Sequence, residues 1–170
     1  EHTFVDHTGK TVRIGDYFDG ERPVLLTLNW YGCKTLCSTQ LNELLRALKM
    51  FEWTAGKDYR MVTVSIDPRE GTELAAGKRT SYLEALGRGQ DVDWNFLTGT
   101  KSAIDALAAD VGYTYNYDKR QDQYVHTTVL YVLTPDGKIS HYLFGLSYRA
   151  RDMKLALMEA SKGRIGNTFD

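Results

Sequence analysis

Two cysteines, Cys33 and Cys37, are the residues with the clearest capacity for chemistry in this chain. A spacing of four residues places them one turn apart if a helix begins here, with Cα atoms about 6 Å from each other. Unpaired backbone N–H groups at the start of a helix, together with the helix dipole, favour the thiolate form. Such a pair can bind a soft metal ion when reduced and form a disulfide when oxidised.

A CxxxC pair alone is weakly specific, because cysteines are among the most frequently buried residues. The location of this pair strengthens the signal. A continuous apolar run over residues 23–30 precedes it, and leucines at helical spacing follow it: Leu41, Leu44, Leu45 and Leu48. A strand, a turn and a helix would therefore carry the cysteines, and open α/β sheets build their sites at such turns.

The remaining chain alternates between strand and helix patterns. An amino-terminal hairpin is predicted from Thr3 to Ile14. Further strands are predicted over residues 59–66, 94–97, 127–133 and 138–144, and helices over residues 73–86, 101–111 and 153–158. This order predicts an α/β, thioredoxin-like fold: a mostly parallel central sheet with a terminal antiparallel hairpin, and helices on both faces.

Composition restricts the classes of function. The 170 residues are expected to form one domain, 1–170, with a core roughly from 20 to 162. A net charge of −1 provides no bulk cationic field, which argues against a nucleic-acid partner. No apolar run approaches the roughly 18 residues of a membrane span, so a membrane is expected only through an amino-terminal anchor missing from this sequence.

His126 is the strongest candidate to join the two sulfurs. It lies just before the predicted strand 127–133, which is central in this topology, so its ring would approach the start of the first helix. Two thiolates and one imidazole suit Cu(I), and a fourth weak ligand would adapt the set to Cu(II). Residues 113–124 before it alternate as an extended segment with one aromatic face and an exposed tip at 118–122, a candidate partner surface or part of the core.

Thiol–disulfide exchange is the alternative chemistry. The two cysteines would then reduce a partner's disulfide, and His126 would tune the acidity of the thiols instead of binding metal. Disulfide oxidoreductases of this fold place a cis-proline opposite their cysteines, whereas residues 125–128 contain no proline, which favours metal binding. A redox or copper sensor that passes nothing on is a third interpretation.

At these residues the chain resembles the SCO/SenC family of copper-binding, thioredoxin-like proteins. The resemblance runs from about Phe4 to Ile165. It is carried by residues 24–37 with the CxxxC motif, the strand and turn at 62–68, Phe96-Leu-Thr-Gly99, and residues 125–137 with His126 and Thr134-Pro-Asp-Gly137. The ordered set of segments is far more specific than CxxxC alone.

The resemblance implies a metallochaperone that holds one copper ion per chain through Cys33, Cys37 and His126. It also implies a periplasmic or membrane-tethered location facing the periplasm, and a copper-receiving respiratory oxidase subunit as partner. Two positions depart from the family pattern: Ser38 replaces a proline, and no aspartate lies two residues before His126. Neither change removes a ligand, and the second leaves Asp122 as a candidate outer partner of the ligands.

Overall fold

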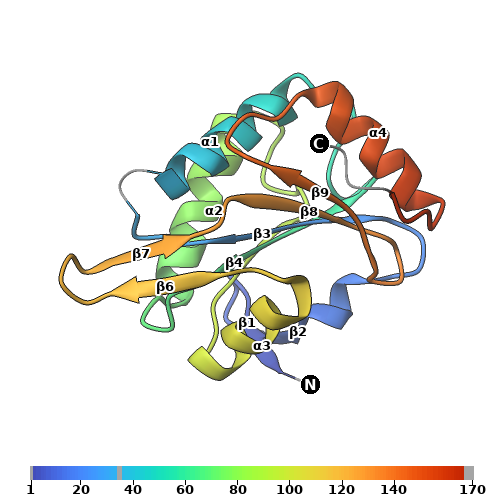
Figure 1. The fold of residues 1–170 in the computed structure, drawn as a ribbon. Coiled ribbons are helices and arrows are strands. Elements are labelled where there is room, and N and C mark those ends of the chain that lie inside the picture. Colours follow the sequence, from blue (N-terminus) through green and yellow to red (C-terminus); the bar gives the residue numbers. More distant parts are fainter. Residues whose placement is uncertain (1, 34–35, 167–170) are drawn as a thin grey trace.

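A five-stranded sheet forms the middle of the molecule (Figure 1). The computed structural model describes residues 2–33 and 36–166, and of residues 36–38 the backbone alone. In spatial order the strands are β5 (Trp94–Leu97), β4 (Arg60–Ser65), β3 (Val24–Asn29), β8 (Val129–Leu133) and β9 (Ile139–Phe144). The first three run parallel, β8 is antiparallel to β3, and β9 is antiparallel to β8. The predicted sheet with its terminal antiparallel hairpin is confirmed.

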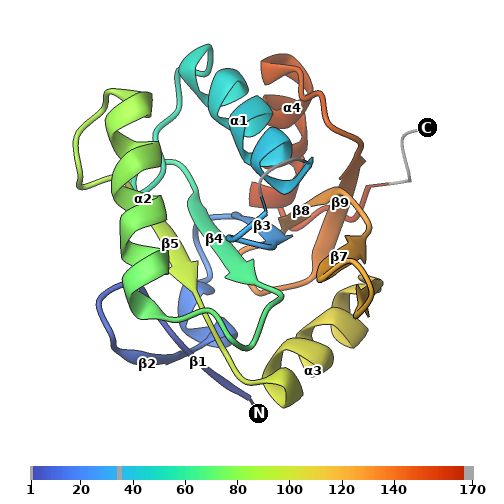
Figure 2. The same cartoon turned by 90° about the vertical axis from the view of Figure 1, so that its left-hand side faces the viewer.

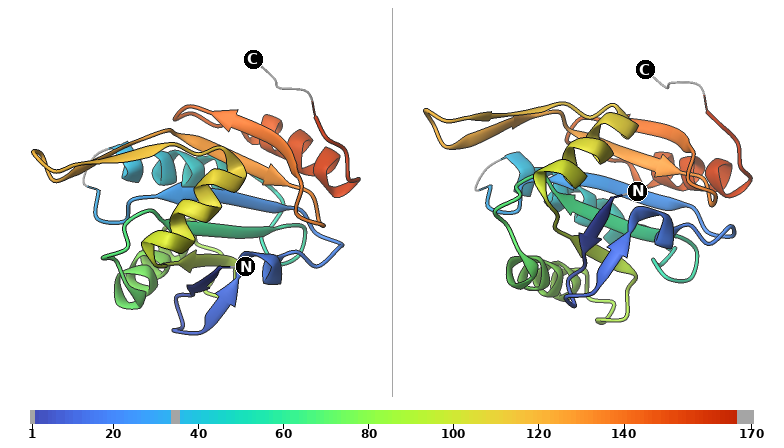
Figure 3. Two further views of the ribbon diagram at one scale, coloured as in Figure 1. Left: turned by 60° about the horizontal axis from the view of Figure 1, so that its bottom comes forward. Right: turned by 90° about the horizontal axis from the view of Figure 1, so that it is seen from below.

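Helices cover both faces of the sheet (Figures 2 and 3). One face carries α1 (Leu36–Lys49), α2 (Thr72–Leu86) and α4 (Ala150–Ser161). The other carries α3 (Lys101–Val111), the hairpin of β1 (Thr3–Val5) and β2 (Thr11–Arg13), and the 3-10 turn η1 (Ile14–Tyr17). No helix in the described residues is both long enough and apolar enough to cross a bilayer.

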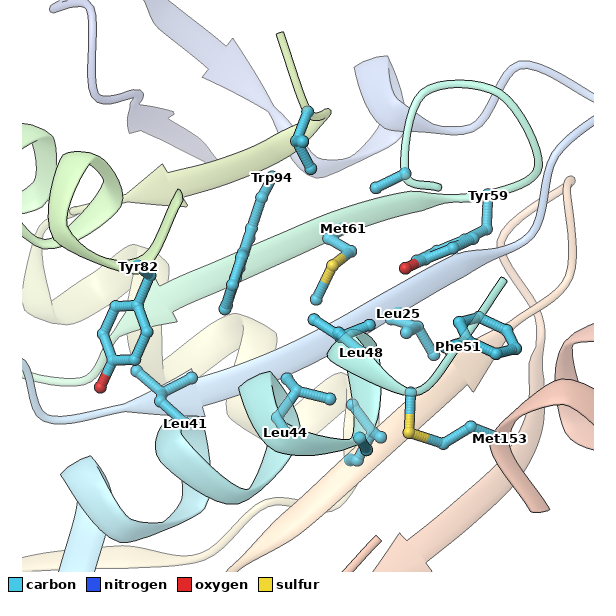
Figure 4. Packing of buried hydrophobic residues seen from close by; sticks show 14 of the residues in the cluster. Leu25, Leu41, Leu44, Leu48, Phe51, Tyr59, Met61, Tyr82, Trp94 and Met153 are labelled. Carbon is cyan, nitrogen blue, oxygen red and sulfur yellow. The ribbon is translucent and has the colours of Figure 1, made fainter. Parts of the chain in front are cut away.

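The burial of β3 explains why the strand before the cysteines is so apolar. All six of its residues are buried, and its side chains alternate between two apolar clusters. Leu25 packs in the cluster under α1, α2 and α4, whereas Leu26 and Leu28 pack in the cluster under α3. Figure 4 shows Leu44 and Leu48 of α1 in the first cluster. The helix that contains Cys37 is therefore fixed on the sheet by burial, at about 1.5–3 kcal/mol for each leucine.

Strands β6 (Tyr115–Asp118) and β7 (Gln123–His126) form a separate antiparallel ribbon. The ribbon extends beyond the end of the central sheet (Figures 1 and 3). The sequence predicts the extended conformation correctly, but it places His126 at the entrance to the central strand. His126 instead ends β7, and Thr127 and Thr128 separate it from β8. The ribbon, not the sheet, therefore determines where the imidazole lies.

Candidate metal and thiol site

Cys33 lies in the loop between β3 and α1. Its backbone N–H donates to the carbonyl oxygen of Trp30 at 3.1 Å, which closes a turn directly after the strand. The residue is buried, with 8% of its surface exposed. The loop therefore holds the first cysteine under a covering of protein at the carboxyl end of β3.

Cys37 is the second residue of α1, whereas Cys33 precedes the helix in the loop after β3. The predicted helix start therefore includes the second cysteine only. Its side chain, like the whole of residues 34 and 35, lies outside the described part of the chain. The predicted convergence of its sulfur with that of Cys33 stays a prediction. The helix itself supplies the N-terminal turn whose backbone N–H groups favour a thiolate.

The ring of His126 contacts residues that flank the two strands of the ribbon. Nδ1 lies 3.0 Å from the carbonyl oxygen of Thr127, and the ring stacks on Tyr113 with centroids 6.4 Å apart. Because a carbonyl oxygen can only accept, the neutral imidazole carries its proton on Nδ1. Its lone pair then lies on Nε2, the nitrogen that a metal ion would use.

An aromatic contact joins the ribbon to the cysteine loop. The indole of Trp30 meets the ring of Tyr124 edge to face, with centroids 5.3 Å apart. Tyr124 and His126 lie on the same face of β7, because they are two residues apart on one strand. Trp30 also forms the turn that contains Cys33. The structure thus brings the cysteine loop and the histidine strand into contact.

Glu70, in the loop between β4 and α2, holds the backbone in front of Cys33. Its carboxylate accepts hydrogen bonds from the N–H groups of Tyr31 at 2.9 Å and Gly32 at 2.6 Å, and from the hydroxyl of Ser65 at 2.6 Å. Burial raises the pKa of Glu70 against the opposing effect of these hydrogen bonds. No motif in the sequence singles out Glu70, although a carboxylate after the strand beside β3 lies where such sheets build their sites.

Arg69 of the same loop reaches the ribbon. Its guanidinium pairs with the buried Asp67 at 3.0 Å and with Asp122 at 3.5 Å, and lies over the ring of Tyr117 at 5.2 Å. Asp122, the candidate outer partner of the ligands, thus lies at the ribbon tip and contacts Arg69 and the hydroxyl of Tyr117. The carboxylate of Asp67, at the turn after β4, thus fixes Arg69.

A buried amide network lies behind the cysteine loop. Asn29, at the end of β3, donates to the side-chain oxygen of Gln40 at 2.7 Å, and both residues are fully buried. Gln40 in turn donates to the carbonyl oxygen of Val129 at 3.1 Å and to the hydroxyl of Tyr148 at 3.0 Å. The network ties α1 to the strand that follows His126.

The donors in this region suit a copper ion by their chemistry. Thiol sulfur and an imidazole with its lone pair on Nε2 are the soft and intermediate ligands that copper accepts. Among the described side chains, no three from His, Cys, Asp and Glu gather as a metal site. The predicted set includes Cys37, whose side chain is not among those described. The assignment of Cys33, Cys37 and His126 as ligands is therefore a proposal.

One comparison with known proteins identifies a family. A sequence model of the family described as SCO1/SenC matches residues 1–158. No curated protein sequence matches the chain significantly. Solved structures with the same fold include ScoI of Arabidopsis thaliana with copper bound, which is 16% identical with a TM-score of 0.76 and covers 95% of this chain and 96% of its own.

Two other solved structures have a similar degree of likeness. A SCO1/SenC family lipoprotein from Bacillus anthracis is 22% identical, with a TM-score of 0.70 and 92% of each chain covered. BsSco, a member of the Sco family of cytochrome c oxidase assembly proteins in which a disulfide switch has been identified, is 24% identical with a TM-score of 0.66, covering 94% of this chain and 90% of its own. At these identities the structural likeness establishes the fold.

Proposed function

The chain belongs to the SCO1/SenC family, and from this premise we propose that it is a copper metallochaperone. Cys33, Cys37 and His126 hold one copper ion per chain, which the protein contributes to the copper centre of a respiratory oxidase. Two thiolates and an imidazole bind Cu(I) well, and a fourth weak ligand adapts the set to Cu(II). The copper bound to the Arabidopsis relative supports this choice of metal.

The observation that carries the proposal is the contact between Trp30 and Tyr124. The two aromatic residues belong to segments almost a hundred positions apart in the sequence, and each segment supplies proposed ligands. Their contact supports a common site for sulfur and imidazole.

The proposed partner is an oxidase subunit that receives copper, and the proposed location is the periplasm or an equivalent compartment. The description of BsSco as a cytochrome c oxidase assembly protein supports the partner. The Bacillus anthracis relative is a lipoprotein, which supports tethering to a membrane. Transfer requires only ligand exchange, in which the partner's thiolates replace those of Cys33 and Cys37 one at a time.

Copper titration of the reduced protein under a competing chelator tests the proposal. The wild type is expected to take up one Cu(I) per chain, and Cys33→Ser/Cys37→Ser to take up none. Affinity should fall as the pH drops, because ligation needs deprotonated sulfur and neutral imidazole. Equal uptake by the wild type and the double variant would overturn the proposal.

Thiol–disulfide reduction is the second candidate function, favoured by the place of Cys37 in the first turn of α1. One thiolate attacks the partner's disulfide and forms a mixed disulfide, with release of one partner thiolate. The second cysteine then attacks the mixed disulfide, so the partner gains two thiols and this chain a disulfide. The identified disulfide switch in BsSco supports this alternative.

His126→Ala separates the two functions. If His126 is a ligand, the variant loses copper affinity but retains disulfide turnover. Unchanged copper affinity would remove His126 from the ligand set and leave the reductase as the better interpretation. Thr128→Ala, two residues further along the chain, is the matched control for disturbance of this segment.

A further inference from the structure

The loop between β4 and α2 contacts both segments that carry the proposed ligands. Glu70 contacts the cysteine loop, and Arg69, one residue earlier, contacts the ribbon that ends in His126. Both lie between two firmly placed elements, since β4 is paired with a strand on each side and α2 packs on the sheet. A short stretch of chain thus joins two segments that are far apart in the sequence.

On the cysteine side, both oxygens of Glu70 are engaged. Oε1 accepts from the N–H of Tyr31 and from Ser65, and Oε2 accepts from the N–H of Gly32. A Cβ atom at position 32 would lie 3.0 Å from Oε2, so the backbone approaches the carboxylate as closely as glycine allows. The backbone N–H groups of the two residues before Cys33 are therefore fixed relative to β4.

On the histidine side, Arg69 is fixed before it reaches the ribbon. Asp67, of which the side chain is only 4% exposed, accepts from the Arg69 backbone N–H at 2.9 Å and from Nε at 3.0 Å. The guanidinium then contacts Asp122 and the face of Tyr117, at the tip and on β6 of the ribbon. The ribbon is held from the same loop that holds the cysteine turn.

We propose that residues 67–70 are a positioning loop that sets the separation between the Cys33 turn and the His126 strand, with Glu70 and Arg69 as its two contacts. This proposal rests on the proposed copper function, because copper binding would require a defined separation between the Cys33 turn and the His126 strand. Neither residue binds the metal. Each acts through the segment that it holds, as residues behind metal ligands commonly do.

Glu70→Gln tests the cysteine side. Glutamine keeps the size of the side chain, but its NH₂ group cannot accept a hydrogen bond, so one of the two backbone N–H groups loses its acceptor. In the reduced, metal-free protein, amide hydrogen exchange at Tyr31 or Gly32 should become about tenfold faster or more. Cu(I) affinity should fall about 10–100-fold. Glu73→Gln, an exposed glutamate in the first turn of α2, is the matched control and should change neither quantity.

Arg69→Met tests the histidine side. The variant keeps the length of the side chain and removes the charge that faces Asp122 and Tyr117. Amide exchange should accelerate in β6 and β7 while Tyr31 and Gly32 keep their protection, and copper affinity should fall. Lys78→Met on α2 is the control for the loss of one positive charge. Because Arg69→Met leaves the buried Asp67 without its ion-pair partner, circular dichroism first establishes that the variant folds.

Two measurements separate positioning from general stability and from the copper function itself. The thiolate-to-copper absorption band of the Cu(II)-loaded protein should shift in Glu70→Gln and not in Glu73→Gln, whereas a mere loss of stability would leave the band of the folded protein in place. If the wild type binds no copper but exchange accelerates as described, the positioning loop stands and the copper function falls. If the wild type binds copper and both loop variants match their controls in exchange and affinity, the positioning loop is overturned and the copper function stands.

Discussion

The buried side-chain amide of Gln40 makes three hydrogen bonds behind the cysteine loop. Gln40→Leu should lower the free energy of unfolding by about 2–3 kcal/mol, because Asn29 and the carbonyl oxygen of Val129 lose their partners in a buried setting. Urea denaturation followed by circular dichroism measures the change.

Gln121→Leu is the control, because Gln121 is exposed at the ribbon tip. It should change the free energy of unfolding by less than about 0.5 kcal/mol. A second variant, Asn29→Leu/Gln40→Leu, should lose less stability than the sum of its single changes, since the double replacement leaves fewer unpaired groups. A full additive loss would show that the two amides are energetically independent.

Asp19 gives the protein a defined response to acid. Burial alone would raise the pKa of the Asp19 carboxyl group. Hydrogen bonds from the backbone N–H groups of Arg22 and Glu21 and from the Arg22 side chain outweigh burial and lower this pKa to about 2. A depressed pKa in the folded state means that the ionised form contributes stability above the ordinary value near 4. This contribution is lost as the pH falls through about 2.

Asp19→Asn should therefore lower the free energy of unfolding at pH 7 by about 1 kcal/mol, a figure reduced for partial exposure to solvent. The difference from wild type should shrink between pH 4 and pH 2. Urea denaturation at pH 7, 4 and 2 measures it, with the exposed Asp110→Asn on α3 as the control for removal of a charge. A difference that stays constant down to pH 2 would contradict the assignment.

At the scale of elements, side-chain contacts hold the β6–β7 ribbon to the rest of the molecule, among them that of Tyr124 with Trp30 and that of Asp122 with Arg69. Tyr124→Ala removes the edge-to-face contact with Trp30, worth about 0.5–1.5 kcal/mol beyond the lost apolar area. The ribbon should then open more often, and trypsin should cleave after Lys119 or Arg120 at its tip about threefold to tenfold faster. Gel or mass analysis of timed digests measures the rate.

Asn116→Ala is the control, because this residue lies on the opposite face of the ribbon from Tyr124 and is exposed. Its cleavage rate should match that of the wild type. Equally faster cleavage of both variants would contradict a specific role of the contact with Trp30 in keeping the ribbon closed.

The ribbon also shows where prediction from local sequence ends. Alternating residues in the segment 113–124 predict an extended backbone, and strands β6 and β7 confirm it on either side of the tip. The alternation does not reveal the partner of each strand. Only the three-dimensional arrangement shows that Tyr115 pairs with His126 and that Thr127 and Thr128 break the path into β8.

For the whole molecule, the two apolar clusters share one sheet and should unfold together. Leu44→Ala, under α1, and Ile104→Ala, under α3, should each lower the free energy of unfolding by about 2–5 kcal/mol. Both should do so within one cooperative transition, with equal calorimetric and van't Hoff enthalpies. Leu155→Ala is the control, because the Leu155 side chain is half-exposed. Two resolved unfolding transitions would contradict a single folding unit of residues 1–170.

At this scale the sequence predicts the architecture better than the site. Strand and helix patterns, with the handedness of crossovers, suffice for the order of layers and for the place of Cys33 at the end of β3. Glu70 and Gly32 are 38 residues apart and meet only because β4 lies beside β3. Such contacts leave no periodic trace in the sequence, so the residues that hold the site had to come from the structure.

The position of the Trp30 indole makes tryptophan fluorescence a probe of the proposed site. Of the three tryptophans, Trp94 is fully buried between the sheet and its helices, and Trp53 packs beside Phe51 at the edge of the same layer. Trp30 alone stands in the cysteine turn and against the histidine strand. The tryptophan fluorescence of the protein therefore includes one indole that should respond to metal binding or disulfide formation at the cysteines. The difference between the spectra of the wild type and of Trp30→Phe would give the contribution of Trp30.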